Sequence, residues 1–583
     1  QGGECDLQDQ AMGFGHAGSR FNENKRAVEE KYMGPLIKTI MTRCIHCTRC
    51  VRFSSEVAGV ENMGLINRGE NAEITTLENA VASELSGNVI DLCPVGALTS
   101  KPYAFVARPW ELTKTESVDV MDAVGSNIRV DARDNEVLRI LPRLHEDVNE
   151  EWISDKTRFA CDGLSRQRLD QPYVRGKDGK LAPASWGEVL SLAADKLKSA
   201  GSNAAAIVGD QACVESMFAL KDLMKTIGSQ NLDCRQDGSA LDPAVAASYR
   251  FNTTIARIEE SDVCLIIGSD PRSEAPVLNA RLRKRYLKGG FKVGLVGNRR
   301  DLTYRYDYLG AGGDTLSQIA DGSHPFKEIL QNAERPMLIL GVGALSRQDG
   351  QAVLAAAHKI ANDTGMVQEG WNGFNVLQTA ASRVGGMMIG CVPSEGGIGT
   401  KEILAGAKNG EIEVLYLLGA DEFNMDNLGN TFVIYQGHHG DAGAHRANLI
   451  LPGAAYTEKN AIYVNMEGRV QLAERATFPP GQARDDWAII RALSAEIGDP
   501  LAYDTQEALR EKIQSAHPEF LAIDTIETAK WGDFGITGNT APTPFESPIA
   551  NFYMTDPISR ASETMAKCVE EILGNREATG TNG

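Results

Sequence analysis

The sequence predicts an α/β protein in which lobes of parallel sheet, covered by helices, follow a small α+β segment rich in cysteine. Two observations support this fold class. Short apolar runs alternate with segments of helical periodicity beyond residue 166, which is the pattern of parallel sheets built from βα units. Five of the eleven cysteines fall within the first hundred residues, so this part is expected to be organised around metal.

Composition and charge restrict the function classes. Hydrophobic residues at 42% and charged residues at 23% are ordinary for a globular protein, which argues against a disordered or coiled-coil chain. The formal charge of −19 argues against a nucleic-acid partner, because phosphate binding relies on clustered Lys and Arg. The longest apolar runs, such as 263–268, have the length of strands, so the chain is not expected to span a bilayer.

The elements are predicted in chain order from periodicity and turn signals. From 111 to 165, alternating apolar residues around the turn 133–136 predict a small β unit. A buried strand at 204–208 precedes a helix that ends at Gly228, and a strand, a helix and a strand follow at 264–267, 276–288 and 292–296. Further strands are predicted at 337–340, 414–418, 432–435 and 448–451.

The last part of the chain loses this rhythm. Prolines at 542, 544, 548 and 557 predict an extended arm, followed by a short helix near 559–573 and a disordered tail at 578–583. We therefore predict four regions, with boundaries at 1–110, 111–165, 166–500 and 501–583.

The motif that carries chemistry is Cys44-x2-Cys47-x2-Cys50 with a distant Cys93-Pro94. Three thiolates from one tight loop and a fourth from elsewhere in the chain suit a cubane iron-sulfur cluster. The alternative is a structural zinc site, which also accepts four cysteines but usually takes them as two separated pairs. His46 lies inside the loop and is interpreted as a neighbour of the site, since four cysteines are present.

Two weaker patterns are interpreted as structure. The Gly-Val-Gly run at 341–343 follows a predicted strand but lacks the third glycine of a dinucleotide loop, so we predict a tight turn. Four residues with ligand chemistry gather in a glycine-rich segment that we interpret as a structured loop: His438, His439, Asp441 and His445.

Several longer runs make the chain recognisable. These are TRCIHCTRCVRF at 42–53, DLCPVGAL at 91–98, SDKTRFACDGL at 154–164, YTEK at 456–459 and NFYMTD at 551–556. Together they closely resemble the large iron-sulfur subunit family of respiratory NADH:quinone oxidoreductase, complex I. The resemblance covers essentially the whole chain, and it implies that a [4Fe-4S] cluster is ligated by Cys44, Cys47, Cys50 and Cys93.

The resemblance also implies clusters that this chain does not complete. The family carries an N-terminal [2Fe-2S] domain and a second [4Fe-4S] site built from one His and three Cys, and Cys5 corresponds to the last of those cysteines. The opening residues read as a truncated or processed start, so both clusters are expected only in the full-length protein. Within this chain, Cys5 is expected to be a single buried or oxidised thiol.

The region 111–165 and the lobes of 166–500 resemble molybdopterin oxidoreductases, whose opening domain holds a cluster by C-x2-C-x3-C and a later Cys. Here Asp119, Asp122 and Ser126 stand where the first three cysteines would fall, and only Cys161 remains. One thiolate does not hold a cubane. We expect an inherited scaffold without that cluster and without molybdopterin.

The resemblance implies an electron-transfer subunit of complex I with no substrate site of its own. Its expected partners are other peripheral-arm subunits, including a neighbour that carries NADH and FMN, and electrons would pass towards quinone. Membrane contact is expected only through the complex, on the cytoplasmic face of a bacterial plasma membrane or the matrix face of the mitochondrial inner membrane. The alternatives are a molybdopterin-dependent oxidoreductase, a relay subunit of an NAD-linked hydrogenase, and a scaffold whose cysteines hold zinc.

Overall fold

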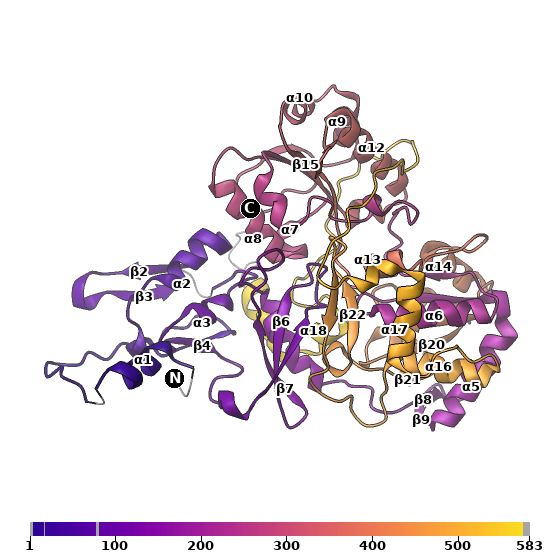
Figure 1. The fold of residues 1–583 in the computed structure, drawn as a ribbon, viewed down its shortest axis with the longest axis horizontal. Coiled ribbons are helices and arrows are strands. Elements are labelled where there is room, and N and C mark those ends of the chain that lie inside the picture. The colour runs from indigo at the N-terminus through magenta and orange to yellow at the C-terminus, as the bar shows by residue number, and fades with distance from the viewer. Residues whose placement is uncertain (1–3, 17, 77–80, 575–583) are drawn as a thin grey trace.

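The computed structural model describes residues 4–16, 18–76 and 81–574, and the tail predicted at 578–583 lies outside them. Three bodies are visible in Figure 1: the cysteine-rich region with a small sheet beside it, a lobe around β20 (Phe432–Gly437), and a lobe around β15 (Pro336–Gly341). None of the helices in the described ranges is long and apolar enough to cross a membrane.

The cysteine-rich region is built from short elements. Two antiparallel pairs, β1 with β4 and β2 with β3, provide its frame. Short helices precede and follow these strands. Most of the cysteines of this region lie outside the helices and strands. The elements are α1 (Asp6–Phe14), β1 (Ile37–Thr39), α2 (Arg49–Arg52), the π-helical turn η2 (Phe53–Ala58), β2 (Met63–Ile66), β3 (Glu73–Thr76), α3 (Asn88–Leu92) and β4 (Leu98–Ser100).

The β unit predicted at 111–165 is a three-stranded antiparallel sheet of β5 (Thr113–Val118), β6 (Asn127–Arg133) and β7 (Glu136–Pro142). Asp134 and Asn135 connect β6 to β7 with φ of 50° and 65°. Two left-handed residues make the tight hairpin turn whose twist matches the strands, which confirms the predicted turn. Helix α4 (Asp155–Phe159) follows and is capped by the side chain of Ser154.

The first lobe contains a seven-stranded sheet in the order β11-β10-β19-β20-β21-β8-β9. The five strands from β11 to β21 run parallel, and β8 and β9 form an antiparallel edge. Helices α5, α6 and α16 cover one face, while α14 and α15 cover the other. The bounds are β8 (Tyr173–Arg175), β9 (Leu181–Pro183), α5 (Trp186–Ala200), β10 (Ala204–Val208), α6 (Val214–Thr226), β11 (Leu232–Asp233), α14 (Thr400–Asn409), β19 (Val414–Leu418), β20 (Phe432–Gly437), α15 (Ala442–Arg446), β21 (Leu449–Pro452) and α16 (Asp486–Ile497).

The second lobe contains an all-parallel sheet in the order β14-β13-β12-β15-β18. Helix α8 packs on one face, and α9, α10 and α12 pack on the other. Strands with both faces covered read as continuous apolar runs, which is why the sequence revealed them. The bounds are β12 (Val263–Ile267), α7 (Pro271–Glu274), α8 (Pro276–Leu287), β13 (Lys292–Val296), β14 (Asp307–Gly310), α9 (Gly313–Asp321), α10 (Phe326–Gln331), β15 (Pro336–Gly341), α11 (Val342–Leu345), α12 (Gly350–Asp363) and β18 (Phe374–Leu377).

Smaller elements lie between the lobes and beside them. Two antiparallel hairpins pair β16 with β17 and β22 with β23. The bounds are β16 (Val367–Gln368), β17 (Trp371–Asn372), α13 (Arg383–Met388), β22 (Ala461–Val464) and β23 (Val470–Ala473).

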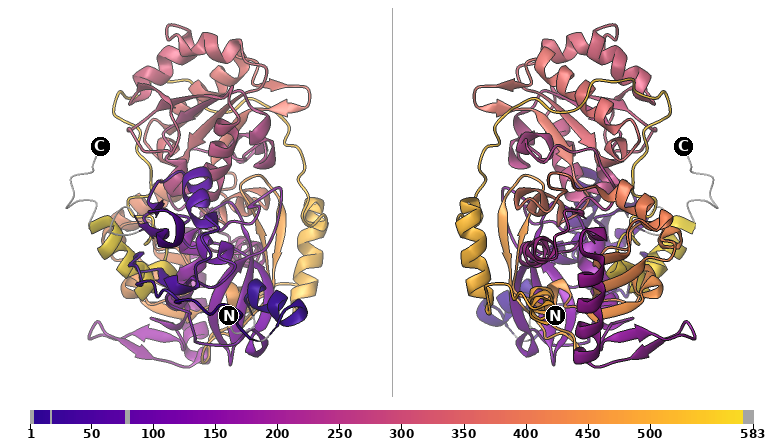
Figure 2. Two further views of the ribbon diagram at one scale, coloured as in Figure 1. Left: turned by 90° about the vertical axis from the view of Figure 1, so that its left-hand side faces the viewer. Right: turned by 90° about the vertical axis from the view of Figure 1, so that its right-hand side faces the viewer.

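The C-terminal part differs from the expectation in two details. Helix α17 (Gln506–Ala516) stands where the sequence predicts extended chain, and its Leu509 and Ile513 pack into the core shared with α6. The predicted helix at 559–573 is broken into α18 (Pro557–Ala561), α19 (Glu563–Cys568) and a π-helical turn, because Ser562 is extended and caps α19. Between α17 and α18 an extended arm runs along the five-stranded lobe and returns (Figure 2).

Candidate metal centre

Four cysteines line one recess in the cysteine-rich region: Cys44, Cys47, Cys50 and Cys93. Cys44 and Cys47 lie in the short loop that leads into α2, and Cys50 lies in the first turn of that helix. Within this loop His46 and Thr48 adopt left-handed backbone conformations, with φ of 53° and 61°. These two turns fold the loop tightly, so that all three cysteines border the same recess.

Strand pairing brings the fourth cysteine to this loop. Residues of β1 pair with β4 in the register Thr39 with Leu98, and the Ile40 amide donates to the carbonyl of Ala97 at 2.8 Å. Cys44 follows β1 by as many residues as Cys93 precedes β4, so the antiparallel pair places them near each other. Cys93 ends α3 in extended conformation, and the proline after it disfavours any helical continuation.

The electrostatics of the recess favour a cationic occupant. Burial raises the pKa of Cys50 to about 12, and the neighbouring thiolates of Cys93, Cys44 and Cys47 add to the shift. Burial likewise raises the pKa of Cys44. The hydrogen bond from the His46 amide opposes this increase, and the neighbouring Cys93 and Cys47 add to it. The thiolate forms of Cys44 and Cys50 are therefore unfavourable here without positive charge beside them. Iron or zinc would supply that charge, since metals bind the thiolate form.

The remaining lining is mostly apolar, with one arginine. Besides the cysteines and Arg49, it consists of Met41, Ile45, Ile74, Val95, Ala97 and Leu98. An apolar shell limits the access of water and strengthens interactions with a nearby charge. His46 stays exposed in the loop between the cysteines, which fits its interpretation as a neighbour.

Cys5 adjoins this centre. It is buried immediately before α1, and its Sγ donates a hydrogen bond to the carbonyl oxygen of Pro94 at 3.6 Å. Pro94 directly follows Cys93. The structure therefore places the cysteine of the incomplete motif against the backbone of the complete one.

The donor set of the small β unit does not fit a further cluster. Asp119, Asp122 and Ser126 are buried, and Cys161 supplies the single thiol of the region. Burial raises the pKa of Asp119 well above its ordinary value, Asp122 adds to this, and the ammonium group of Lys156 opposes it. Clusters are held mainly by thiolates, so two carboxyls, a hydroxyl and one thiol do not match an iron-sulfur site.

The crevice at the carboxyl ends of the five-stranded sheet is filled by the chain itself. In open parallel sheets this crevice is where nucleotide-type ligands bind. Here the Phe545 amide donates to the carbonyl of Ala311 at 2.8 Å, and the Phe545 carbonyl accepts from the Asn298 amide at 3.2 Å. A Cβ on Gly268, the residue after β12, would lie 3.0 Å from that of Phe545.

Further contacts fix the arm over the same strand ends. Arg347 donates from its guanidinium to the carbonyls of Ala541, Thr543 and Pro544, and Asp349 accepts from the Ala541 amide at 2.7 Å. A Cβ on Gly343, at the run predicted to be a tight turn, would collide with the Glu546 carbonyl oxygen. Because the arm backbone occupies this space, the carboxyl ends of the five-stranded sheet do not fit a molybdopterin nucleotide cofactor.

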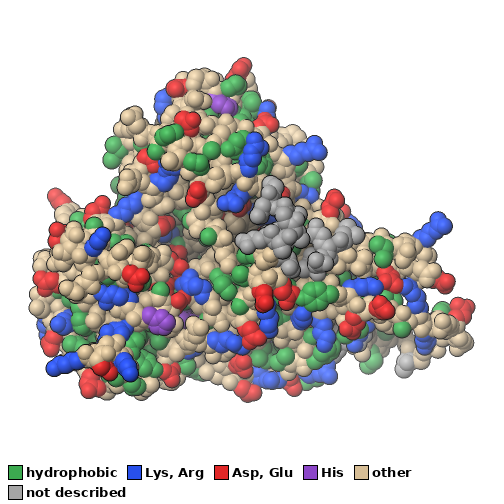
Figure 3. All heavy atoms as spheres, turned by 180° about the vertical axis from the view of Figure 1, so that it is seen from behind, with side chains coloured by type: hydrophobic (Ala, Val, Ile, Leu, Met, Phe, Trp, Pro, Cys, Tyr) green, Lys and Arg blue, Asp and Glu red, His purple; other side chains and the backbone are tan. Residues whose placement is uncertain are grey.

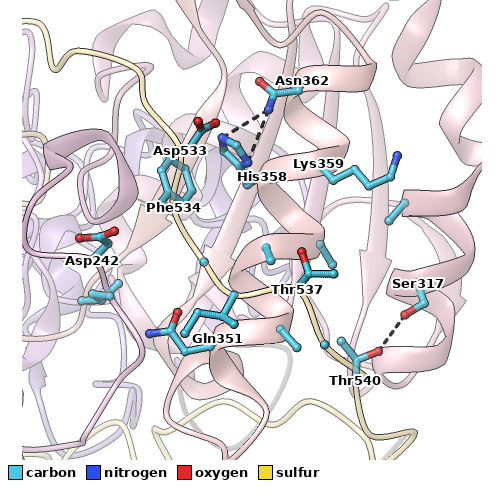
Figure 4. Close-up of a pocket in the computed structure, with 18 of the residues that line it drawn as sticks. Asp242, Ser317, Gln351, His358, Lys359, Asn362, Asp533, Phe534, Thr537 and Thr540 are labelled. Atoms are coloured by element: carbon cyan, nitrogen blue, oxygen red, sulfur yellow. Dashed lines mark hydrogen bonds between the residues drawn. The ribbon is translucent and has the colours of Figure 1, made fainter.

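A cavity of about 930 Å³ lies farther out, between α9, α12 and residues 533–540 of the arm (Figure 4). His358 on α12 stacks on Trp531 with ring centroids 5.0 Å apart and contacts Phe534 at 4.3 Å. Its Nε2 also lies 3.1 Å from the Gly532 carbonyl. Thr540 is hydrogen-bonded to Ser317 on α9. These contacts attach the arm to the lobe.

The four residues of the glycine-rich segment 438–445 take structural positions. His439 is buried and its Nε2 lies 2.9 Å from the Gly163 carbonyl, while its Nδ1 lies 2.5 Å from that of His438. Asp441 caps α15 and binds Arg560, and His445 lies in the last turn of α15. Across the described residues, no group of three or more His, Cys, Asp or Glu is arranged to hold a single metal ion.

The sequence patterns did not identify the residues that support Cys93. Asp155 and Arg158 on α4 contact the segment that leads to this cysteine. Both fall within the run 154–164 that carries the resemblance, but no local pattern pairs that run with 84–91.

Four family descriptions match successive parts of the chain. Residues 34–99 match the ferredoxin-like domain of NADH-quinone oxidoreductase subunit 3. Residues 112–162 match the NADH-ubiquinone oxidoreductase NDSU1/NuoG-like 4Fe-4S domain, although Asp119, Asp122 and Ser126 leave that segment with one cysteine. Residues 168–496 match molybdopterin oxidoreductase, and residues 525–568 match the C-terminal part of the NuoG-type polypeptide of NADH-ubiquinone oxidoreductase.

Relatives align along nearly the whole chain. The NuoG-type polypeptide of NADH-quinone oxidoreductase from Rickettsia bellii is 49% identical over 98% of this chain and 82% of its own length. The mitochondrial NADH dehydrogenase (ubiquinone) iron-sulfur protein 1 of Solanum tuberosum is 48% identical over 97% and 76%. Among solved structures, acetylene hydratase from Pelobacter acetylenicus aligns with a TM-score of 0.45 and 16% identity, over 66% of this chain and 69% of that one.

Proposed function

Because the chain belongs to the NuoG-like family of NADH-quinone oxidoreductase and is an electron-transfer iron-sulfur subunit of complex I, we propose that one [4Fe-4S] cluster is held by Cys44, Cys47, Cys50 and Cys93. The observation that supports this assignment is the convergence of these four cysteines on one recess. The matched ferredoxin-like segment, 34–99, contains all four. A [4Fe-4S] cluster would supply one-electron transfer at this position.

The residues of the chain contribute binding and environment. The four thiolates bind the iron, the apolar lining excludes water, and the Arg49 guanidinium stands at the recess to offset negative charge.

We further propose that Cys5 is one ligand of a second [4Fe-4S] cluster. The contact between the Cys5 sulfur and the Pro94 carbonyl supports this, because it brings the second site next to the first. A short separation favours electron transfer between the two. We propose that the lobes bind no molybdopterin, on the evidence of the arm in the crevice.

The homologues are subunits of a quinone-reducing complex, so the chain has other subunits of that complex as partners. We propose that one neighbour carries NADH and FMN. We also propose that the protein lies on the cytoplasmic face of a bacterial membrane or the matrix face of a mitochondrial one, reaching the membrane only through the complex.

The experiment that tests the assignment compares two cysteine variants in the assembled complex. Cys93→Ala should abolish NADH:quinone activity and the cluster signal, while NADH oxidation by an artificial acceptor, which needs only the flavin, continues. Cys264→Ala is the matched control, because Cys264 is a buried thiol in β12 away from the recess. It should retain both activities. A wild-type cluster signal in an assembled Cys93→Ala complex would overturn the assignment. Normal quinone reduction in a Cys93→Ala complex that lacks the signal would overturn the role of this cluster in electron transfer.

A further inference from the structure

Helix α3 determines where Cys93 lies, because that cysteine is the residue at which the helix ends. The helix is short, with five residues, and short helices depend on tertiary contacts for their stability. Its first turn has no side-chain cap of its own. The contacts that fix α3 therefore also fix the sulfur of the fourth cluster ligand.

The amino-terminal end of α3 is held by Asp155. Its carboxylate accepts hydrogen bonds from the amide of Ser86 at 3.1 Å and from the amide of Gly87 at 2.6 Å. The Asp155 amide in turn donates to the carbonyl of Glu84 at 2.8 Å. These three bonds attach the start of α3 to α4, in the β unit that lacks a cluster of its own.

The other end of α3 is held by Arg158. This guanidinium is 4% exposed and pairs with both carboxylate oxygens of Asp91, which lies two positions before Cys93. It also donates to the side-chain oxygen of Asn88 at 3.2 Å. The Asn88 side chain donates a hydrogen bond to the Ile153 carbonyl and accepts one from the Ile153 amide. Arg158 thus spans α3 from its first residue to its last turn.

The residue before α3 packs closely against side chains of α4. A Cβ placed on Gly87 would lie 2.7 Å from the ring of Phe159 and 2.8 Å from Cδ of Arg158. Only a glycine at this position allows α3 to approach α4 so closely. The hydrogen bonds and the steric fit therefore specify one position for the helix.

We infer that Asp155 and Arg158 are positioning residues for the cluster, which hold α3 so that Cys93 meets the loop of Cys44, Cys47 and Cys50. This inference rests on the proposed function. It also gives the β unit at 111–165 a role. This unit has no donor set that fits a cluster of its own, and it supports Cys93, a cluster ligand in the neighbouring cysteine-rich region. Groups that orient metal ligands typically change metal affinity about 10- to 100-fold when they are mutated.

The test uses Arg158→Met and Arg158→Lys in the assembled complex, with iron release to a chelator and the low-temperature EPR signal of the reduced cluster as readouts. Arg158→Met should release iron about 10- to 100-fold faster than wild type. Arg158→Lys keeps the charge and loses the planar, paired geometry, so it should also release iron faster, by a smaller factor, with an altered EPR line shape. The lysine variant keeps the test decisive if the methionine variant does not assemble.

The matched control is Arg168→Met, which removes a buried arginine paired with Glu458 and away from residues 84–93. It should lower stability and leave iron release unchanged. Wild-type iron release and an unchanged EPR signal in Arg158→Lys would overturn the inference. If Cys93→Ala loses the cluster while the Arg158 variants keep it, the proposed function stands and only the inference fails. If Cys93→Ala keeps the cluster, the proposed function itself fails.

Discussion

Phe545→Ala tests whether the arm is an integral part of the five-stranded lobe. The Phe545 side chain is 1% exposed, packs against Gly268, and lies under the guanidinium of Arg347 with its ring centroid 4.9 Å away. Truncating a buried phenylalanine to alanine costs about 3–5 kcal/mol. Since about 1.4 kcal/mol corresponds to a factor of ten, the population with a released arm should rise by roughly two to three and a half orders of magnitude.

Limited proteolysis under native conditions measures that population directly. Cleavage between residues 522 and 556 should accelerate by the same factor when opening is fast relative to cleavage. Ile536→Ala is the control, because that side chain lies in the same arm and is 67% exposed. Its cleavage rate should match the wild-type rate. Equal cleavage rates for Phe545→Ala and wild type would refute the claim that the crevice is filled by a stably bound arm.

Two further predictions concern the contact between residues 163–168 and the 438–439 loop. Burial, reinforced by the charge of Arg168, lowers the pKa of His439 to about 4, below its unfolded value near 6.5. The unfolded state therefore binds more protons than the folded state between these two pH values. The free energy of unfolding should fall by about 3 kcal/mol as the pH drops from 7 to 4, and urea titrations should find a weaker pH dependence in His439→Gln. Arg168→Met leaves Glu458 buried without its partner and should lower the free energy of unfolding by about 3–5 kcal/mol; a loss below 1 kcal/mol would show that the pair is solvated.

Much of the lobe architecture was predictable because parallel strands with both faces covered are continuous apolar runs. The strands predicted at 204–208, 292–296 and 414–418 have the bounds of β10, β13 and β19. Helix α17 was not predicted, since only Leu509 and Ile513 of its residues are buried and most of its other residues are polar. Its stability comes from packing against α6, which no local pattern reveals.

The candidate site shows the same division. The spacing of Cys44, Cys47 and Cys50 is local, so the sequence alone indicates a shared recess. The support for Cys93 is long-range: Arg158 and Asp91 are 67 positions apart, and their pairing depends on how two domains pack. The route of the arm is likewise invisible in sequence, because prolines predict extended chain without predicting which surface it covers.

On the outer surface, acidic side chains are interspersed with Lys and Arg on the face drawn in Figure 3. Interspersed charge of both signs is typical of a surface that associates through specific contacts rather than through a single-sign field. The net charge of −19 favours a protein or small-molecule partner over nucleic acid.

Metal analysis combined with EPR of the reduced protein tests the central claim most directly. Reconstituted wild-type and Cys264→Ala chains should each contain about four iron atoms per chain and show the signal of a reduced [4Fe-4S] cluster. Cys93→Ala should lose or degrade that signal. Stoichiometric zinc in the wild-type chain, with no iron-dependent absorption, would contradict the assignment of Cys44, Cys47, Cys50 and Cys93 to an electron-transfer cluster.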